Sequence, residues 1–582
     1  MRRIAVKTAV AIMTLVIMAS VMILPASALS SPPYVGYNYD PYGVSTAAPI
    51  GYLPDGTIDF EDMGLAQAMT SPQDMFVFDN KEIWITDSAG VVPPEAEQAE
   101  DVATEDAATE DAATEDAATE DAATEETKEE KEDSGVQVSA STQYGRIIVL
   151  DTNFKFLREY TSFTAEDGTE ELIPSPQGLF VRYNKQTEQE EMFICCNLTV
   201  KDATGTERKD GYVICADMDG NIIRKYTRPD SPGTNIKDFQ PLSVVVDDSN
   251  YLYLQAYGVL DGIIVYTYDK GEYESFYGAN KVVLTWKLLV EQTIKKIFSR
   301  KATEGMLKAV PTEMSNMFID EEGFIYTTTA TATVEKELRV RKLNAAGSNT
   351  LKADVNSLVD VVFGDRDTGS FISGGQRLGS DTRLEDICVD ANGVMACMDT
   401  ERSRVYIYDQ TCMLLTAFGY KSTGTAVEGS VAAATAIDQL SDGRYLILDG
   451  TRGTIVTYRP TEYMSMLLEA NKFYTDGRYV EGEKYWRNVL KYDANFARGY
   501  AAIGKSLREQ KDYEGSLYWL KQGQDRTSYS LALQEYRKEY LRENYMWFIP
   551  LVAVICVAAV ALFRFIQKLL GIQRKKKKIK FS

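Results

Sequence analysis

Histidine is absent from all 582 residues, so any chemistry has to come from carboxylates, amides, hydroxyls or thiols. This composition excludes imidazole bases, imidazole metal ligands and Ser-His or Cys-His nucleophiles. Asp74, Asn316 and Asp386 each begin a similar apolar stretch, and oxygen ligands of this type bind Ca²⁺. Glu313 and Glu385 lie close to two of them and are further candidate ligands. The alternative is that the three small polar residues only cap the turn into a strand.

Cysteine is the other reactive residue type, with seven in the chain. Cys388 and Cys397 lie symmetrically about Asn392-Gly393, a favoured two-residue hairpin turn. A type I′ turn at this point would make the two cysteines a facing pair that could form a disulfide. The alternative is that they are free, buried thiols.

Six stretches share the pattern that contains the candidate ligands. Each has an apolar strand, a turn at Asp or Gly and an aromatic-rich second strand, and in most of them a third and a fourth strand follow. Because a single four-stranded sheet cannot cover both of its own faces, the six predict a mostly β fold, a six-bladed β-propeller over residues 34–459. In such a propeller Asp74, Asn316 and Asp386 could meet at the channel mouth as oxygen ligands. The residues that begin the six first strands are Asp74, Gly178, Ser243, Asn316, Asp386 and Ala434.

The sixth blade supplies only three clear strands before Thr461, which leaves room for a fourth. The N-terminal segment Tyr34–Leu53 is rich in strand-forming residues, with tyrosines alternating with small ones. A propeller must join its last blade to its first or leave an open edge. We therefore predict that a strand from within this segment pairs with blade six; the alternative is a tyrosine-rich linker on the surface.

Two inserts interrupt the propeller. The sequence Ala-Thr-Glu-Asp-Ala repeats four times over 103–122, and 95–133 holds 18 acidic residues and two lysines, or −16 of the net −23. We predict a disordered, solvated loop over 92–141 within blade one, because nothing in it can form a core. The remaining −7 is an ordinary surface value, and an acidic chain is a poor partner for nucleic acid. Residues 286–305 have the apolar spacing of an amphipathic helix.

A helical unit is predicted after the propeller, over residues 461–543. Two copies align at a spacing of 34, with small residues where helices would touch and large ones between them, the pattern of a tetratricopeptide (TPR) pair. The matched positions are Ala470 with Gly504, Phe473 with Leu507, Tyr479 with Tyr513, Gly482 with Ser516 and Tyr485 with Trp519. A third helix, Ser528–Glu543, is expected to cap the pair. Peptide binding on a concave face and a simple spacer role are equal alternatives.

Both ends of the chain have membrane signals. Residues 1–28 combine basic residues, an apolar run and Ala26-Ser27-Ala28, which predicts a cleaved signal peptide, with an uncleaved anchor as the alternative. Residues 545–566 are apolar and about 20 long, enough to cross a hydrocarbon core of ~30 Å. The tail 567–582 contains the run Lys575–Lys578, so the positive-inside tendency predicts a cytoplasmic tail and an outside ectodomain. Contact of this tail with anionic lipid is an alternative to a purely topological role.

The fifth repeat carries the run Asp399-Thr400-Glu401-Arg402-Ser403-Arg404-Val405, which resembles the signature of NHL-type propeller blades. The stretch 311–329 is similar to a group of membrane-anchored NHL/TPR proteins of Gram-positive bacteria, often encoded near carbohydrate ABC transporters. We predict a non-enzymatic protein of the cell surface without a cofactor, and the resemblance implies that it assists carbohydrate uptake. Its propeller would bind a ligand or protein, and its TPR unit would contact a partner such as a transporter or a solute-binding protein.

The same resemblance to six-bladed propellers implies a rival function, a calcium-dependent lactonase-like hydrolase. In that case Asp74, Asn316 and Asp386 would be the calcium ligands, and Glu313 or Glu385 would complete the set. A purely structural spacer is a third possibility.

Overall fold

The computed structural model describes residues 32, 34–92, 137–201, 206–229, 236, 238–259, 261–278, 314–330, 338–353, 360–365, 372–373, 376–377, 382–424 and 427–570. The predicted signal peptide, the predicted helix over 286–305, Glu313, and most of both the acidic insert and the basic tail lie outside these residues. The chain forms two compact units, a strand unit that ends at Met464 and a mainly helical unit from Ser465 onward, to which the segment Asp40–Val44 also belongs.

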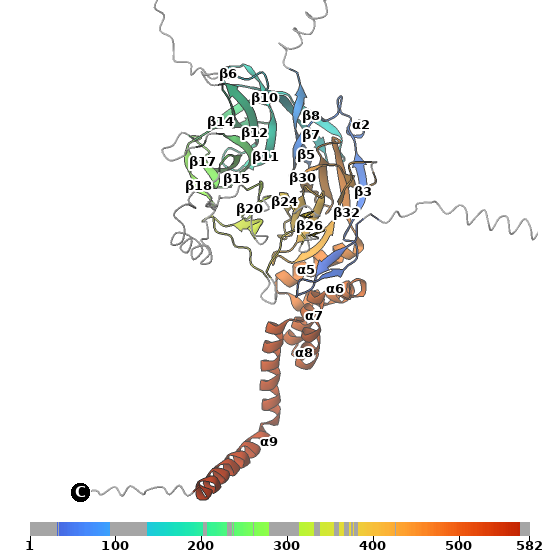
Figure 1. The fold of residues 1–582 in the computed structure, drawn as a ribbon, viewed down its shortest axis with the longest axis vertical. Coiled ribbons are helices and arrows are strands. Elements are labelled where there is room, and N and C mark those ends of the chain that lie inside the picture. Colours follow the sequence, from blue (N-terminus) through green and yellow to red (C-terminus); the bar gives the residue numbers. More distant parts are fainter. Residues whose placement is uncertain are drawn as a thin grey trace, which may run out of the picture. The chain divides into compact units, whose positions relative to one another are not determined.

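The strand unit is a six-bladed β-propeller (Figure 1). In chain order its blades are β4–β5–β7–β8, β11–β12–β13–β14, β15–β16–β17–β18, β19–β20–β21, β24–β25–β26–β27 and β30–β31–β32–β3. Their bounds are β4 (Pro72–Phe78), β5 (Glu82–Val91), β7 (Tyr144–Asp151), β8 (Phe156–Tyr160), β11 (Pro176–Asn184), β12 (Gln189–Lys201), β13 (Glu207–Asp217), β14 (Ile222–Thr227), β15 (Gln240–Val246), β16 (Tyr251–Tyr257), β17 (Ile263–Thr267), β18 (Tyr273–Tyr277), β19 (Asn316–Ile319), β20 (Ile325–Thr328), β21 (Val340–Leu343), β24 (Leu384–Val389), β25 (Met395–Asp399), β26 (Arg404–Tyr408), β27 (Leu414–Phe418), β30 (Ala434–Gln439), β31 (Tyr445–Asp449), β32 (Thr454–Pro460) and β3 (Tyr52–Ile58).

Short elements decorate the blades. They are β1 (Tyr37–Tyr39), β2 (Ser45–Ala47), α2 (Phe60–Met63), β6 (Gln137–Val138), β9 (Ser162–Thr164), β10 (Glu170–Pro174), β22 (Ile372–Ser373), β23 (Gln376–Arg377), β28 (Tyr420–Lys421) and β29 (Ser430–Val431).

The blades pack face to face in a closed ring. Each innermost strand contacts the innermost strand of the next blade, in the order β4, β11, β15, β19, β24, β30 and back to β4. A middle strand is therefore covered on both faces, and β25 and β31 are buried at every position. This explains why these strands read as continuous apolar runs and not as an alternation of apolar and polar residues.

The N-terminal segment closes the ring, as predicted. Strand β3 pairs antiparallel with β32, from Tyr52 opposite Pro460 to Ile58 opposite Ile455, and Figure 1 shows the two side by side. The closing strand lies further along the chain than predicted, because only its first two residues fall within the segment that ends at Leu53. The ring of Tyr52 is buried, with its centroid 4.6 Å from that of Phe418, so the strand also contributes to the core. The earlier tyrosines form β1, which pairs with β2.

Several hairpin turns of the blades are built on aspartates. In blade five, Oδ1 of Asp390 accepts the backbone N–H groups of Asn392 and Val394, each at 2.8 Å. This side chain replaces a backbone acceptor and stabilises a turn longer than two residues. Asp151, Asp217, Asp320 and Asp409 make the same pair of contacts in their own hairpins.

The longer turn changes the register of the two neighbouring cysteines. Val389 pairs with Met395, so Cys388 lies opposite Ala396, and Cys397 lies opposite Ile387. The facing pair that a two-residue turn would give is therefore wrong, and both thiols are free and buried.

The C-terminal end of the predicted disordered loop belongs to the fold. Strand β6 pairs with β12 through Val138 and Val200, and the buried Ser139 donates its backbone N–H to the carbonyl of Thr199 at 2.8 Å. Residues 137–140 therefore belong to the described fold, although the predicted loop extended to Ser141.

The helical unit contains α5 (Glu462–Thr475), α6 (Tyr479–Tyr492), α7 (Ala497–Glu509), α8 (Tyr513–Gln522) and α9 (Arg526–Leu569). The second helices of the two pairs, α6 and α8, begin 34 residues apart. Small residues lie where helices meet: a Cβ on Gly504 would come within 2.5 Å of the side chain of Leu520. The predicted capping helix and the predicted span are one continuous helix of 44 residues with Pro550 inside it. Within the described part of the chain, α9 is the one helix long and apolar enough to cross a membrane.

Candidate functional site

Two of the candidate ligands connect neighbouring blades. Oδ2 of Asp74 accepts the backbone N–H of Leu179 in blade two at 2.9 Å, and Oδ2 of Asp386 accepts that of Ile437 in blade six at 2.6 Å. The free edge of an innermost strand has backbone donors with no partner in its own sheet, and a buried donor needs an acceptor. The carboxylates of Asp74 and Asp386 supply that acceptor.

A third carboxylate, Asp438, does the same at the ring closure, because its Oδ2 accepts the backbone N–H of Val77 in blade one at 2.6 Å. The sequence pattern placed Asp438 with the turn aspartates and placed Ala434 in the column of candidate ligands. The register shows that this alignment is wrong by two residues: Ala434 pairs with Asp449 as Leu384 pairs with Asp399, so Ala436 is the residue equivalent to Asp386. The turn position is occupied by Leu440, which has no carboxylate.

Asn316 and Asp386 are brought together, since Nδ2 of Asn316 donates to Oδ1 of Asp386 at 2.5 Å. Glu385 is directed elsewhere, to Arg383 at 2.6 Å. Within the described residues, no three carboxylate or thiol groups gather as a set that could hold a metal ion. Both oxygens of Asp74 and both oxygens of Asp386 accept backbone N–H groups.

Burial controls the acidity of these carboxylates. Desolvation and, to a smaller extent, the nearby charge of Asp386 raise the pKa of Asp438 to about 7. Desolvation also raises the pKa values of Asp74 and Asp386, the former with added repulsion from Asp386 and Asp438. The backbone N–H bonds oppose this shift, because they stabilise the ionised form.

The second blade has glycine where the first and fifth have aspartate. A Cβ on Gly178 would lie 2.2 Å from the carbonyl oxygen of Leu242 in blade three. The backbones of blades two and three approach too closely for any side chain at this position, so glycine is required there.

A second set of aspartates, Asp87, Asp399 and Asp449, occupies equivalent positions in the second strands of three blades, opposite Pro72, Leu384 and Ala434, and all three are buried. Each accepts backbone N–H groups from the segment that enters the same blade; for Asp449 these are Ala432 at 2.7 Å and Ala433 at 3.2 Å. Each is also paired with an arginine: Asp87 with Arg146 at 3.3 Å, Asp399 with Arg402 at 3.1 Å and Asp449 with Arg452 at 3.6 Å. Residues 399–405 therefore fix the position of the backbone segment that leads into the blade.

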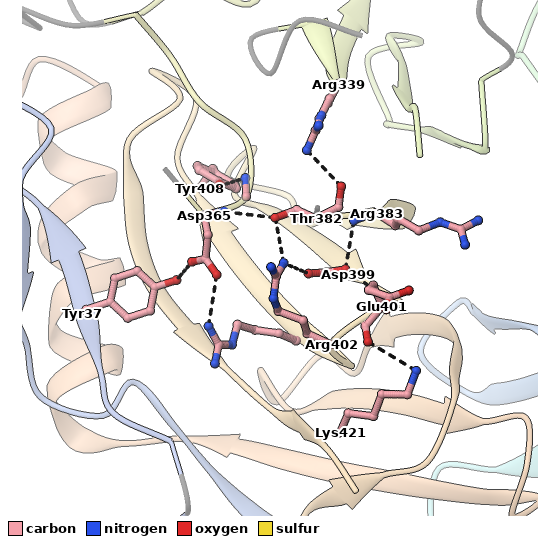
Figure 2. A network of polar contacts seen from close by, with 12 residues as sticks. Tyr37, Arg339, Asp365, Thr382, Arg383, Asp399, Glu401, Arg402, Tyr408 and Lys421 are labelled. Carbon is pink, nitrogen blue, oxygen red and sulfur yellow. Dashed lines mark hydrogen bonds and ion pairs between the residues drawn. The ribbon is translucent and has the colours of Figure 1, made fainter. Parts of the chain in front are cut away.

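Figure 2 shows how this network of polar contacts extends in blade five. Arg402 donates to Oγ1 of Thr382 and to Asp399, both at 3.1 Å. Asp365 accepts the hydroxyl of Tyr37 and lies 3.4 Å from Nη1 of Arg404. The N-terminal hairpin is thus tied to blade five across 328 residues of sequence, a contact that no local sequence pattern could reveal.

The described fold and this arrangement define a six-bladed β-propeller with polar bridges between blades and one helix able to span a membrane. No family model matches the chain, and no curated protein matches it. Solved structures with some likeness include a streptogramin B lyase (10% identity, TM-score 0.32, covering 71% of this chain and 98% of that one). The WD40 propeller domain of Doa1 has 8% identity and a TM-score of 0.32, with 71% and 99% covered. Virginiamycin B lyase from Staphylococcus aureus has 10% identity and a TM-score of 0.32, with 70% and 99% covered. A likeness at this level says nothing about activity.

Proposed function

We propose that this chain is a non-enzymatic protein of the cell surface, in which the propeller binds a ligand or protein. One observation carries the non-enzymatic part: oxygens of the inner-strand carboxylates are engaged with backbone N–H groups of neighbouring blades. Carboxylates held in this way fix neighbouring blades to each other, as expected in a rigid scaffold. The continuous helix α9 supports anchoring, because it joins the helical unit directly to an apolar span.

The proposed partner is a carbohydrate ABC transporter or its solute-binding protein. This part rests on the resemblance of the NHL-like blade signature and of the stretch 311–329, and on the 34-residue spacing of α6 and α8, which we interpret as a TPR pair. The proposed topology places the propeller outside the cell and the basic tail in the cytoplasm.

Crosslinking in native membranes tests the partner. Full-length protein with an affinity tag after Ser582 is crosslinked and purified beside a control that keeps the signal peptide and residues 461–582 but lacks the propeller. We expect transporter subunits or a solute-binding protein to be enriched with the full chain alone. Equal recovery from both proteins would contradict a propeller-dependent partner.

Calcium titration separates this proposal from the rival hydrolase. Tight, stoichiometric calcium binding by the full-length protein in detergent, lost in a variant with Asp74→Asn, Asn316→Ala and Asp386→Asn, would overturn the non-enzymatic proposal. We expect the wild type and this variant to give the same weak binding isotherm.

A further inference from the structure

Three consecutive contacts between neighbouring blades, which we call joints, each contain a bridging carboxylate. Asp386 bridges blades five and six, Asp438 bridges six and one, and Asp74 bridges one and two. Each gives one oxygen to the neighbouring blade and the other to the backbone N–H of the next residue in its own strand. Those second donors are Met75 at 2.9 Å, Ile387 at 2.7 Å and Gln439 at 2.7 Å.

The surroundings of these carboxylates disfavour negative charge. Asp386 is 5% exposed and Asp438 9% exposed, while Asp74 is partly buried. Each lies within electrostatic range of at least one of the others, and Asn316 contributes only a neutral amide. Among the described residues, the further titratable groups that interact electrostatically with one of the three are the acidic Glu385 and the thiols of Cys195, Cys388 and Cys397.

We propose that Asp386, Asp438 and Asp74 form a proton-uptake cluster that tightens the three joints between blades five, six, one and two as the medium becomes more acidic. A proton bound by one carboxylate removes its repulsion from the others. The protonated group keeps a carbonyl oxygen that can still accept the N–H of the neighbouring blade. Protonation weakens the bonds from the N–H groups, which favour the ionised form, but it removes both the repulsion between the carboxylates and the cost of burying their charge.

The direction of the pH effect follows from the folded and unfolded states. Burial, with repulsion between the carboxylates, raises the pKa of Asp438 to about 7 and raises those of the other two, whereas an unfolded aspartate titrates near about 4. Between these values the folded protein binds protons that the unfolded chain does not. Stability is therefore fully gained below the unfolded pKa and is lost as the pH rises through the folded pKa.

The test is the thermal unfolding of the full-length protein in detergent between about pH 8 and pH 5.5. The variant carries Asp74→Asn, Asp386→Asn and Asp438→Asn. A matched control carries Glu190→Gln, Asp248→Asn and Asp261→Asn, which remove the same formal charge from exposed positions of the same propeller. The control separates the cluster from the general self-repulsion of an acidic surface.

We expect the midpoint of the wild type to rise by several degrees as the pH falls over this range, on the scale of a few degrees for each tenfold change in the folding equilibrium. The control should keep most of that rise, and the cluster variant should lose most of it. A cluster variant with the same pH dependence as the wild type would overturn the proposal.

A measurement on the wild type covers the case in which the cluster variant does not fold. Infrared difference spectra between about pH 6 and pH 9 should show the carbonyl band of un-ionised carboxylic acid at the lower pH, since exposed carboxyls are fully ionised there. The single variant Asp438→Asn should reduce this band. Absence of the band from the wild type at about pH 6 would overturn the proposal as well.

Discussion

Asp449 shows how much one buried side chain can hold. Its carboxylate accepts four backbone N–H groups, from Ala432, Ala433, Thr451 and Arg452, at 2.7–3.2 Å. We expect Asp449→Ala to destabilise the propeller by about 2–4 kcal/mol, because it leaves buried donors without an acceptor. Calorimetry should show a lower midpoint for the propeller.

The control for this prediction is Asp442→Ala, in the exposed turn of the same blade. Asp442 accepts the backbone N–H of Arg444 at 3.0 Å and pairs with its side chain at 2.7 Å. Because the pair is exposed, we expect a cost below about 1 kcal/mol. Equal costs for the two variants would contradict the structural role of Asp449.

The cysteines give a second prediction at this scale. All seven are free, and Cys412 is the least buried of those in the propeller. After denaturation the number of alkylated thiols, measured by mass spectrometry, should be the same with and without reductant. In the native protein, burial raises the pKa of Cys412 to about 12, so even this thiol should react slowly at neutral pH. Two additional thiols after reduction would show that a disulfide exists.

At the scale of the elements, the strongest prediction concerns deletion of the closing strand β3. Removing residues 29–44 deletes β1 and leaves β3, whereas removing 29–58 also deletes β3 and exposes the edge of β32. We expect a modest loss of thermal stability from the first deletion, through the lost Tyr37–Asp365 contact, and a severe loss from the second. The signal sequence is kept in both. Similar midpoints for both deletions would contradict ring closure by β3.

Local patterns in the sequence predicted the strands of the blades well. The sequence predicted apolar strands separated by turns at Asp or Gly, and β13 and β24 do lead into turns held by Asp217 and Asp390. These boundaries are predictable because an aspartate turn and an apolar run are neighbours in sequence. Asp438 was misplaced because an aspartate after an apolar run looks the same whether it caps a turn or bridges blades. That choice depends on packing between blades, which has no local signature.

Contacts between distant segments were the least predictable part of the candidate site. Asp386 was identified as an oxygen ligand, but its partner Ile437 lies in another blade and contributes only its backbone. Any residue could supply that N–H group, so no residue type reveals it. The tie between Tyr37 and Asp365 was missed for the same reason.

The net charge is distributed unevenly along the chain. The residues outside the acidic insert sum to only −7 because regions of opposite charge partly cancel. Residues 34–94 and 134–464 together carry −20, while residues 465–582 carry +10. The acidity therefore belongs to the propeller as well as to the insert, contrary to the expectation that it describes the insert alone. A propeller of this charge favours partners with basic surfaces and repels other acidic ones.

The proposed topology leads to a whole-cell prediction. Protease added to intact cells should remove the propeller and leave a fragment that contains α9 and the tail, because the proposed topology exposes only the ectodomain outside. An antibody to a tag after Ser582 would detect that fragment by its smaller size. Full-length protein that survives on intact cells and is cut only after lysis would contradict the orientation.

The way the ring closes also determines when its two closing strands are synthesised. Thr457 bonds to the carbonyl of Gly56 across 401 residues of chain, so the closing strand is synthesised long before its partner. At ~5–20 residues per second, translation of the intervening chain takes roughly 20–80 s. During that interval every completed blade belongs to an open arc whose ends expose apolar faces. The last strand to be made, β32, ends the period in which the nascent protein is most vulnerable to aggregation.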